Sequence, residues 1–218
     1  MGRLSFVIAG VAAASVALGC EDSKAESSTG RSEQVLATGS MATAAPSASA
    51  TAAHSAPASP RTLCDKSPRS LPKSTPTFVN AAGDKNTKAR FPLEAKRLLW
   101  INFFAAWCGP CKEEIPRLRR FEAQLQKDGV PVDLAFISID DDARELVGFY
   151  AQQPENGLKA SFWLPDGPPR TAWLSALKMK SSPTLPEHVI VDGKGDAKCF
   201  IDGAVEEGDY PQLLSSLR

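Results

Sequence analysis

Two cysteines separated by two residues carry the clearest chemical signal in this sequence of 218 residues. Cys108 and Cys111 enclose Gly109 and Pro110, and Trp107 precedes them. Thiols at this spacing can exchange reversibly with a disulfide, because one sulfur attacks and the other resolves the mixed disulfide that forms. A zinc site is the competing interpretation, but it needs about four ligands, and the sequence has no second Cys-x-x-Cys and no paired histidines. We therefore favour redox chemistry at this pair.

The flanking sequence predicts a strand before the dithiol and a helix after it. Residues 98–104 are nearly all hydrophobic, which is typical of a central strand covered on both faces. After Cys111, apolar residues recur at helical spacing: Ile115, Leu118, Phe121 and Leu125. Cys108 then falls at a helix N-terminus, where unpaired N–H groups and the helix dipole favour a thiolate. We expect Cys108 to be an exposed nucleophile and Cys111 to be the buried resolving thiol.

The rest of the pattern predicts an α/β fold with a mixed sheet. Residues 132–139 form a second apolar run, so strand, helix and strand indicate a parallel βαβ unit. We interpret Asp140–Asp142 as an acidic loop whose last residue caps a helix, rather than as a metal site. Residues 189–201 predict a β-hairpin, and Asp209 is expected to cap a final helix. We expect a mixed central sheet flanked by helices on both faces.

The dithiol segment and its surroundings resemble a known family. Residues 107–112, Trp-Cys-Gly-Pro-Cys-Lys, have the active-site sequence of thioredoxin, and Pro116 matches the helix-kinking proline of thioredoxin-like folds. The wider context resembles the membrane-anchored TlpA/ResA group, because Asn102 stands where thioredoxins have a buried Asp and Glu114 follows Cys111. The resemblance reaches from about residue 76 to the end of the sequence, and it implies a thioredoxin-like fold.

The same resemblance implies roles for residues around the dithiol. Pro186 resembles the cis-proline of the family, which would lie beside the sulfurs and present the Leu185 backbone to an extended substrate. The residues implied to contact substrate are Trp107, Gly109, Pro110 and Leu185. Glu114 is implied to tune the Cys111 thiol and to shuttle its proton; the alternative is a surface acid favoured by the helix dipole.

The sequence departs from the family pattern directly after this proline. Glu187-His188-Val189 stands where the family usually has Thr-Thr-Phe. A carboxylate and an imidazole at these positions could alter the substrate groove or add a ligand near the sulfurs. We expect instead that Glu187 and His188 are surface-facing strand residues, because a strand turns alternate side chains outward.

The N-terminal part predicts export and a tether rather than a folded domain. Residues 1–19 combine a short positive segment with an apolar run too short for a comfortable membrane span, which is typical of a signal peptide. They lead into Ala17-Leu18-Gly19-Cys20, which resembles a bacterial lipobox, so we expect Cys20 to carry lipid. Ordinary secretion and an uncleaved signal anchor are the alternatives. Residues 20–63 are rich in Ala, Ser, Thr and Pro and predict a disordered tether, which leaves residues 64–218 as the thioredoxin-like domain.

Two further cysteines remain once Cys20 and the dithiol are set aside from the five in the chain. In an oxidising compartment, Cys64 and Cys199 are candidates for a structural disulfide.

These features together predict an exported, lipid-anchored thiol–disulfide oxidoreductase on the periplasmic or extracytoplasmic face of a bacterial membrane. Its expected substrates are disulfides of exported proteins, for example apocytochrome c, and its expected electron donor is a membrane thiol reductant. The reducing direction follows from the Gly-Pro pair between the cysteines, which resembles thioredoxin. No cofactor or metal is expected. The balanced charge and the lack of a basic stripe argue against nucleic-acid binding.

Two alternatives stay open. A disulfide oxidase or isomerase would use the same residues and would differ in reduction potential. A copper-handling protein would hold Cu(I) with the dithiol and a third ligand, for which His188 is the candidate.

Overall fold

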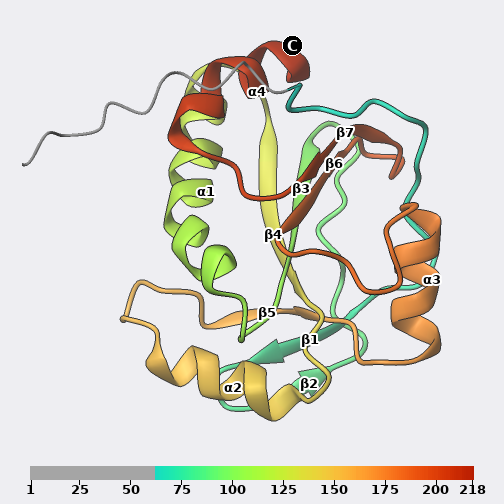
Figure 1. Cartoon of the computed structure of the whole chain (residues 1–218), viewed down its shortest axis with the longest axis vertical. Helices are drawn as coiled ribbons and strands as arrows, with labels where there is room; N and C mark the ends of the chain where they lie inside the picture. The colour runs from blue at the N-terminus through green and yellow to red at the C-terminus, as the bar shows by residue number, and fades with distance from the viewer. Residues whose placement is uncertain (1–61) are drawn as a thin grey trace, which may run out of the picture. The chain divides into compact units, whose positions relative to one another are not determined.

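The computed structural model describes residues 62–218, which form a seven-stranded mixed sheet with helices on both faces (Figure 1). The strands are β1 Thr77–Asn80, β2 Lys85–Asn86, β3 Leu98–Phe104, β4 Val132–Ser138, β5 Ala160–Trp163, β6 Glu187–Val191 and β7 Ala197–Asp202. The helices are α1 Gly109–Lys127, α2 Ala143–Gln152, α3 Pro168–Ala176 and α4 Tyr210–Leu217, with a short 3-10 turn at Glu207–Asp209. This architecture confirms the predicted fold class.

The sheet has the strand order β2-β1-β5-β4-β3-β6-β7. Strand β3 lies near its centre, parallel to β4 and antiparallel to β6. The segment β3-α1-β4 is therefore the parallel βαβ unit that the two apolar runs predicted. Because β3 has neighbours on both edges and helices on both faces, six of its seven residues are buried.

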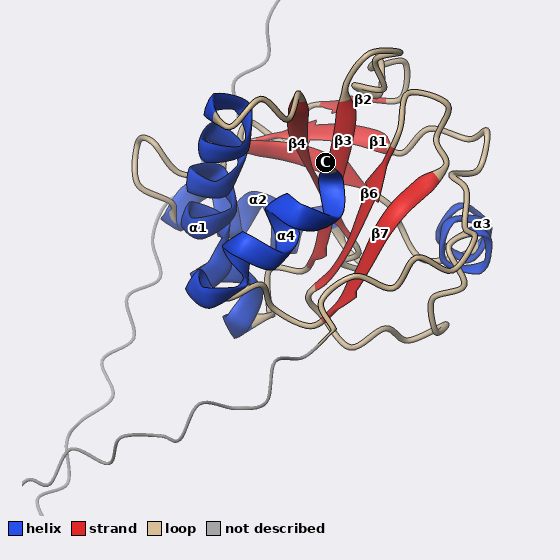
Figure 2. Ribbon diagram, turned by 90° about the horizontal axis from the view of Figure 1, so that it is seen from above, coloured by secondary structure: helices blue, strands red, loops and turns tan. Residues whose placement is uncertain are grey.

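Helices α1 and α4 cover one face of the sheet, and α3 covers the other (Figure 2). The apolar side of α1 packs on the sheet through the four predicted positions, Ile115, Leu118, Phe121 and Leu125, all of which are buried. Burying an apolar side chain of this size stabilises the fold by about 1.5–3 kcal/mol. The packing of α1 therefore holds its first turn, with the dithiol, in a fixed place against the sheet.

The N-caps predicted for two helices can be compared with the structure. Asp142 caps α2 as predicted, because its carboxylate accepts a hydrogen bond from the Arg144 N–H at 2.8 Å. Asp209 precedes α4, but its side chain makes no cap hydrogen bond to that helix. It accepts from the Glu206 N–H at 2.8 Å instead. Asp209 is thus the N-cap residue of α4 as predicted, but its carboxylate is used by the 3-10 turn before the helix.

The segment before β1 is fastened to the sheet edge at β7. A disulfide joins Cys64 to Cys199, with the two Cα atoms 4.9 Å apart. Beside it, Asp65 and Phe200 exchange two backbone hydrogen bonds of 2.9 Å. The segment thus covers an edge strand that would otherwise expose unpaired N–H and C=O groups.

The folded part begins earlier than the sequence predicted. Leu63 falls in the predicted tether, but its side chain is buried in the core next to Cys64. The predicted signal peptide, Cys20 and nearly all of the predicted tether lie outside the described residues. Among residues 62–218, no helix is both long enough and apolar enough to cross a membrane.

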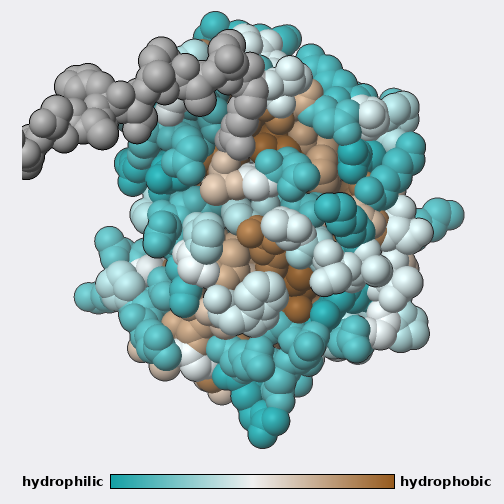
Figure 3. Space-filling model, viewed as in Figure 1, coloured by the Kyte–Doolittle hydropathy of each residue, from teal (hydrophilic) through white to brown (hydrophobic). Residues whose placement is uncertain are grey.

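Apolar residues also reach the surface of this part of the chain. On the face seen in Figure 1, they gather in the middle, between α1 and α3, and hydrophilic residues cover most of the area around them (Figure 3).

Candidate active site

Cys108 and Cys111 form a disulfide at the start of α1, with their Cα atoms 5.4 Å apart. Cys108 is the N-cap residue of this helix, and its sulfur accepts a hydrogen bond from the Cys111 N–H at 3.2 Å. The strand before it and the helix after it are those that the sequence predicted. Peptide N–H groups at a helix N-terminus stabilise a negatively charged sulfur, so this geometry suits Cys108 to be the attacking thiolate after reduction.

Both sulfurs are more enclosed than the sequence suggested. Cys111 is fully buried, as predicted, but Cys108 is only 4% exposed. The prediction of an exposed Cys108 is wrong for the disulfide form, because its sulfur lies over the first helical turn and is bonded to Cys111. The exposed residues here are Gly109, Pro110 and Trp107, which is 64% exposed. A partner would therefore meet these three residues first.

The peptide bond between Leu185 and Pro186 is cis. Pro186 directly precedes β6, whose first residue, Glu187, pairs with Phe103 near the end of β3. The chain leaves β3 at that same end and reaches Cys108 four residues after Phe104. The register of the sheet thus places Pro186 and the dithiol at one end of the central strands.

A buried carboxylate lies one helical turn beyond Cys111. Glu114 is fully buried, which rules out the alternative of a surface acid. Its Oε1 accepts a hydrogen bond from Asn102 Nδ2 of β3 at 2.7 Å, and its Oε2 accepts one from the Val205 N–H at 3.1 Å. Residues three apart on a helix are neighbours, so Glu114 is in place to act on the Cys111 thiol.

His188 of β6 belongs to the same buried cluster. The Trp100 indole N–H donates to His188 Nδ1 at 3.2 Å, and His188 Nε2 lies 3.4 Å from Glu114 Oε1. Asn102 Nδ2 lies 3.4 Å from the same Nδ1. The sequence singles out His188 as a departure from the family pattern and as a candidate copper ligand, but not as a neighbour of Glu114. Its contacts with Glu114, Asn102 and Trp100 are long-range in the chain.

The prediction that Glu187 and His188 face the surface is wrong. Strand β6 lies between β3 and β7 and is covered on both faces, so all five of its residues are buried. Burial and the nearby Asp202 carboxylate raise the pKa of Glu187 to about 7. The unbroken apolar run that follows, Val189–Val191, is the signal that could have corrected this prediction, since doubly covered strands lack alternation.

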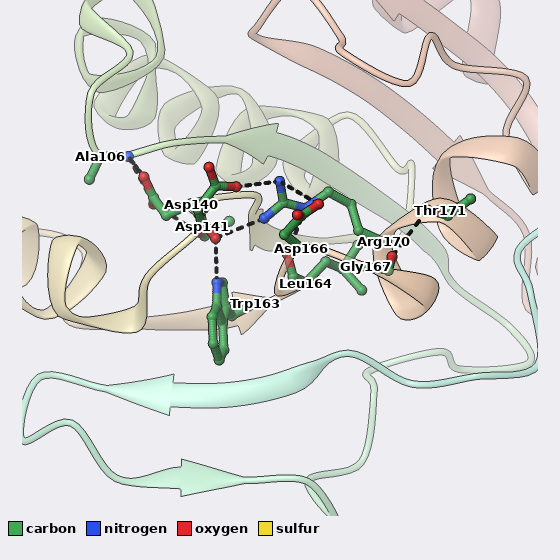
Figure 4. A network of polar contacts seen from close by, with 10 residues as sticks. Ala106, Asp140, Asp141, Trp163, Leu164, Asp166, Gly167, Arg170 and Thr171 are labelled. Carbon is green, nitrogen blue, oxygen red and sulfur yellow. Dashed lines mark hydrogen bonds and ion pairs between the residues drawn. The ribbon is translucent and has the colours of Figure 1, made fainter.

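A second buried carboxylate holds the connection between β3 and α1 (Figure 4). The Asp140 carboxylate accepts the Ala106 N–H at 2.9 and 3.0 Å and the Ser138 hydroxyl at 2.7 Å. Burial raises the pKa of the Asp140 carboxyl. Ala106 lies two residues before Cys108, so Asp140 fixes the backbone that presents the dithiol. Sequence reasoning missed this role because it placed Asp140 in an acidic loop.

Asp140 is itself held by side chains from two other elements. Its carbonyl oxygen accepts hydrogen bonds from Trp163 Nε1 of β5 at 2.7 Å and from the Arg170 guanidinium of α3 at 2.9 Å. Arg170 also donates to Asp141 at 2.7 Å and to the Leu164 carbonyl at 3.0 Å. The connection beside the dithiol is therefore tied to the α3 side of the sheet (Figure 4).

The described residues offer little to a metal ion. Among residues 62–218, no three His, Cys, Asp or Glu side chains are grouped so that they could hold one. His188, the candidate third copper ligand, instead has Trp100 and Glu114 as neighbours.

Known proteins resemble this chain over its folded part. Residues 96–197 match the family model described as thioredoxin-like. A stretch of 64 residues is 34% identical to the thiol-disulfide oxidoreductase ResA of Oceanobacillus iheyensis. That match covers 29% of this chain and 31% of the relative, so the chain spans about a third of that protein.

Solved structures that resemble this chain are more distant in sequence. The thioredoxin domain of a thiol-disulfide oxidoreductase from Bacteroides vulgatus is 14% identical, with a TM-score of 0.48 over 68% of this chain and 100% of that chain. A thioredoxin-family thiol:disulfide interchange protein from Chlorobium tepidum is 18% identical, with a TM-score of 0.47 over 68% of this chain and 97% of that chain.

Proposed function

We propose that the protein is a thiol–disulfide oxidoreductase acting on other proteins. The match of residues 96–197 to the thioredoxin-like family model supports this proposal. The observation that carries the proposal is the Cys108–Cys111 disulfide at the N-terminus of α1, with the Cys108 sulfur accepting the Cys111 N–H. This arrangement supplies an attacking sulfur that is stabilised as a thiolate and a resolving sulfur within bonding distance of it.

The proposed reaction starts from the reduced protein. The Cys108 thiolate attacks one sulfur of a substrate disulfide, and the other substrate sulfur leaves as a thiolate. Cys111 then loses its proton and attacks the Cys108 sulfur, which releases the second substrate thiolate and forms the Cys108–Cys111 disulfide. Two electrons pass from the protein to the substrate, and a thiol reductant restores the dithiol by the reverse exchange.

Glu114 is proposed to accept the proton of Cys111 in the second step. It is buried one helical turn from that thiol, and hydrogen bonds from Asn102 and Val205 hold its carboxylate. A positioned carboxylate of this kind contributes to proton transfer only if it stays within reach of the proton. Those two hydrogen bonds keep it there.

Substrate binding is proposed at the surface around the dithiol. Trp107, Gly109 and Pro110 are exposed beside Cys108, and Leu185 and Pro186 lie at the same end of the sheet. An extended segment of the substrate would lie against these residues, with its disulfide reaching the Cys108 sulfur.

We further propose that the protein is exported and anchored by lipid on Cys20, and that it reduces disulfides of exported proteins, such as apocytochrome c. Export is supported by the signal-like residues 1–19 and by the Cys64–Cys199 disulfide, since such bonds persist in oxidising compartments. The proposed electron source is a membrane thiol reductant. The Gly-Pro pair between the cysteines supports the reducing direction, since thioredoxin has a potential of about −270 mV.

Trapping the mixed disulfide tests the proposal. In Cys111→Ser the second step is removed, so covalent complexes with the natural substrate should accumulate and be identified by mass spectrometry. Cys108→Ser is the matched control and should trap nothing. The proposal fails if neither variant traps a protein while the wild type binds copper tightly. A potential above about −200 mV would reverse the direction and favour an oxidase.

A further inference from the structure

The protonation of His188 can be read from its hydrogen bonds. An indole N–H can donate but not accept, so the Trp100 contact at 3.2 Å requires Nδ1 of His188 to be the acceptor. The imidazole then carries a proton only on Nε2. That nitrogen lies 3.4 Å from Glu114 Oε1 and has no hydrogen-bond partner in the disulfide form.

A buried donor without a partner is uncommon in folded proteins, and it needs an explanation. His188 and Glu114 are both fully buried, so water from the bulk does not reach this nitrogen freely. The Glu114 carboxylate is close enough that a small movement would make the hydrogen bond.

We propose that His188 is a positioning residue for Glu114: Trp100 holds its imidazole in the neutral Nε2–H form, and this N–H supports the charged carboxylate that accepts the proton of Cys111. The inference rests on the proposed proton transfer from Cys111 to Glu114. His188 does not take that proton itself, because protonating Nδ1 would break its hydrogen bond with Trp100. The proton therefore stops on Glu114.

A charged group on the same helix, Arg117, is already bonded to other residues. Arg117, one turn further along α1, donates to the Val205 carbonyl at 2.6 Å and pairs with Glu206 at 3.0 Å and with Glu207 at 3.5 Å. From β3 the cluster receives only the uncharged side chains of Asn102 and Trp100, and from β6 it receives His188. His188 is thus the group from the sheet that can bring an additional N–H to the carboxylate.

Nitrogen NMR of the full chain tests the protonation state directly. The sequence has two histidines, so a His54→Gln background labelled with ¹⁵N-histidine reports on His188 alone. We expect a neutral imidazole with Nε2 protonated and Nδ1 unprotonated, since Nδ1 accepts the Trp100 N–H. In Trp100→Phe, which lacks the indole N–H, Nδ1 loses this donor and the preference for the Nε2–H form should weaken. A doubly protonated imidazole or an Nδ1–H form in the wild type would overturn the inference.

The positioning role is tested in single-turnover resolution of a mixed disulfide between Cys108 and an aromatic disulfide reagent. Attack by Cys111 releases a coloured aromatic thiolate, and its rate is followed against pH in a Cys20→Ala background. Glu114→Gln should remove the acid limb of this profile, whereas Glu113→Gln, at an exposed neighbour, should not.

His188→Leu and His188→Gln separate positioning from packing. Leucine removes the donor, so the carboxylate loses support and the rate of resolution at acidic pH should fall about fivefold. Glutamine keeps an N–H and should restore the wild-type limb. Identical profiles for both variants and the wild type would refute the role. If the wild type resolves the reagent but Cys111→Ser traps no protein, the proposed function fails while this inference stands.

Discussion

The two disulfides among residues 62–218 are the same kind of bond in opposite settings. Cys108 and Cys111 are three residues apart, at a helix end beside the exposed Trp107. Cys64 and Cys199 are 135 residues apart and join the start of the folded part to β7. A short loop gains little from closure, whereas closing a long one stabilises a fold by up to about 5 kcal/mol. The comparison teaches that loop length and surroundings, rather than the bond, separate a reactive disulfide from a structural one.

The largest difference between an effect on turnover and an effect on stability is expected when the reactive sulfur is removed. Cys108→Ser should lower the turnover of protein disulfide reduction by at least about 10³-fold, because the covalent step is lost. Its free energy of unfolding should change by less than about 1 kcal/mol relative to the reduced wild type. Turnover and denaturant unfolding measured on one preparation check both values. Substantial residual turnover would contradict the assigned nucleophile.

The opposite result is expected at the other disulfide. Replacing both Cys64 and Cys199 by Ser should cost about 2–5 kcal/mol of unfolding free energy, while turnover at temperatures below the unfolding transition stays within about twofold of the wild type. Urea unfolding gives the first value. If turnover fell with stability unchanged, this disulfide would belong to the reaction, and the comparison would fail.

Asp140 bears on the reactive disulfide, because it holds the backbone two residues before Cys108. Asp140→Ala leaves the Ala106 N–H and the Ser138 hydroxyl without their partner, so about 1–3 kcal/mol of stability should be lost. Turnover should fall several-fold, measured at a temperature where the variant is folded. Asp140→Asn retains an acceptor and should recover part of both losses. Glu155→Ala, at an exposed site outside this network, is the control.

Glu187 gives the smallest expected effect, beside the second disulfide. It lines a pocket of about 320 Å³ together with Leu63, Asp65 and Phe200, which flank the bonded cysteines. Because its pKa rises from 4.5 to about 7 on folding, the folded protein binds the proton more tightly than the unfolded chain. The stability from this group is full below about pH 4.5 and is lost as pH rises to about 7.

The measurement is unfolding free energy at pH 5 and pH 8 in the wild type and in Glu187→Gln. The wild type should lose on the order of 1–2 kcal/mol more than the variant over this interval, after allowance for screening. Glu155→Gln, at an exposed site, should behave as the wild type. Parallel pH curves for Glu187→Gln and the wild type would show that the carboxyl is not perturbed.

Local pattern predicted the elements that carry the dithiol. The apolar runs of β3 and β4 and the helical spacing after Cys111 are short-range signals, so the βαβ unit and the helix position of Cys108 followed from them. The buried cluster did not follow. Glu114 meets Val205 across 91 positions and His188 meets Trp100 across 88, and no periodicity encodes such contacts.

The misjudged burials have one physical cause. The expectation that placed Glu187 and His188 on the surface assumed a sheet with one wet face, whereas β6 lies in a sheet covered on both faces. Asp140 was hidden for a related reason, because its partner Ala106 comes from the neighbouring strand connection. What a side chain touches across strands depends on register, which single-sequence reasoning does not supply.

The fastening of the first described residues to β7 also has a mechanical meaning. A force applied to the chain ahead of Cys64 reaches the sheet through a covalent bond to Cys199. The hydrogen bonds between Asp65 and Phe200 come one residue after the disulfide in the chain. A pulling force therefore meets the covalent bond before it can break them one by one. The load enters at β7, on the opposite side of β6 from β3, the strand that leads to the dithiol. The domain can therefore be pulled at this end without the strain passing first through its reactive sulfurs.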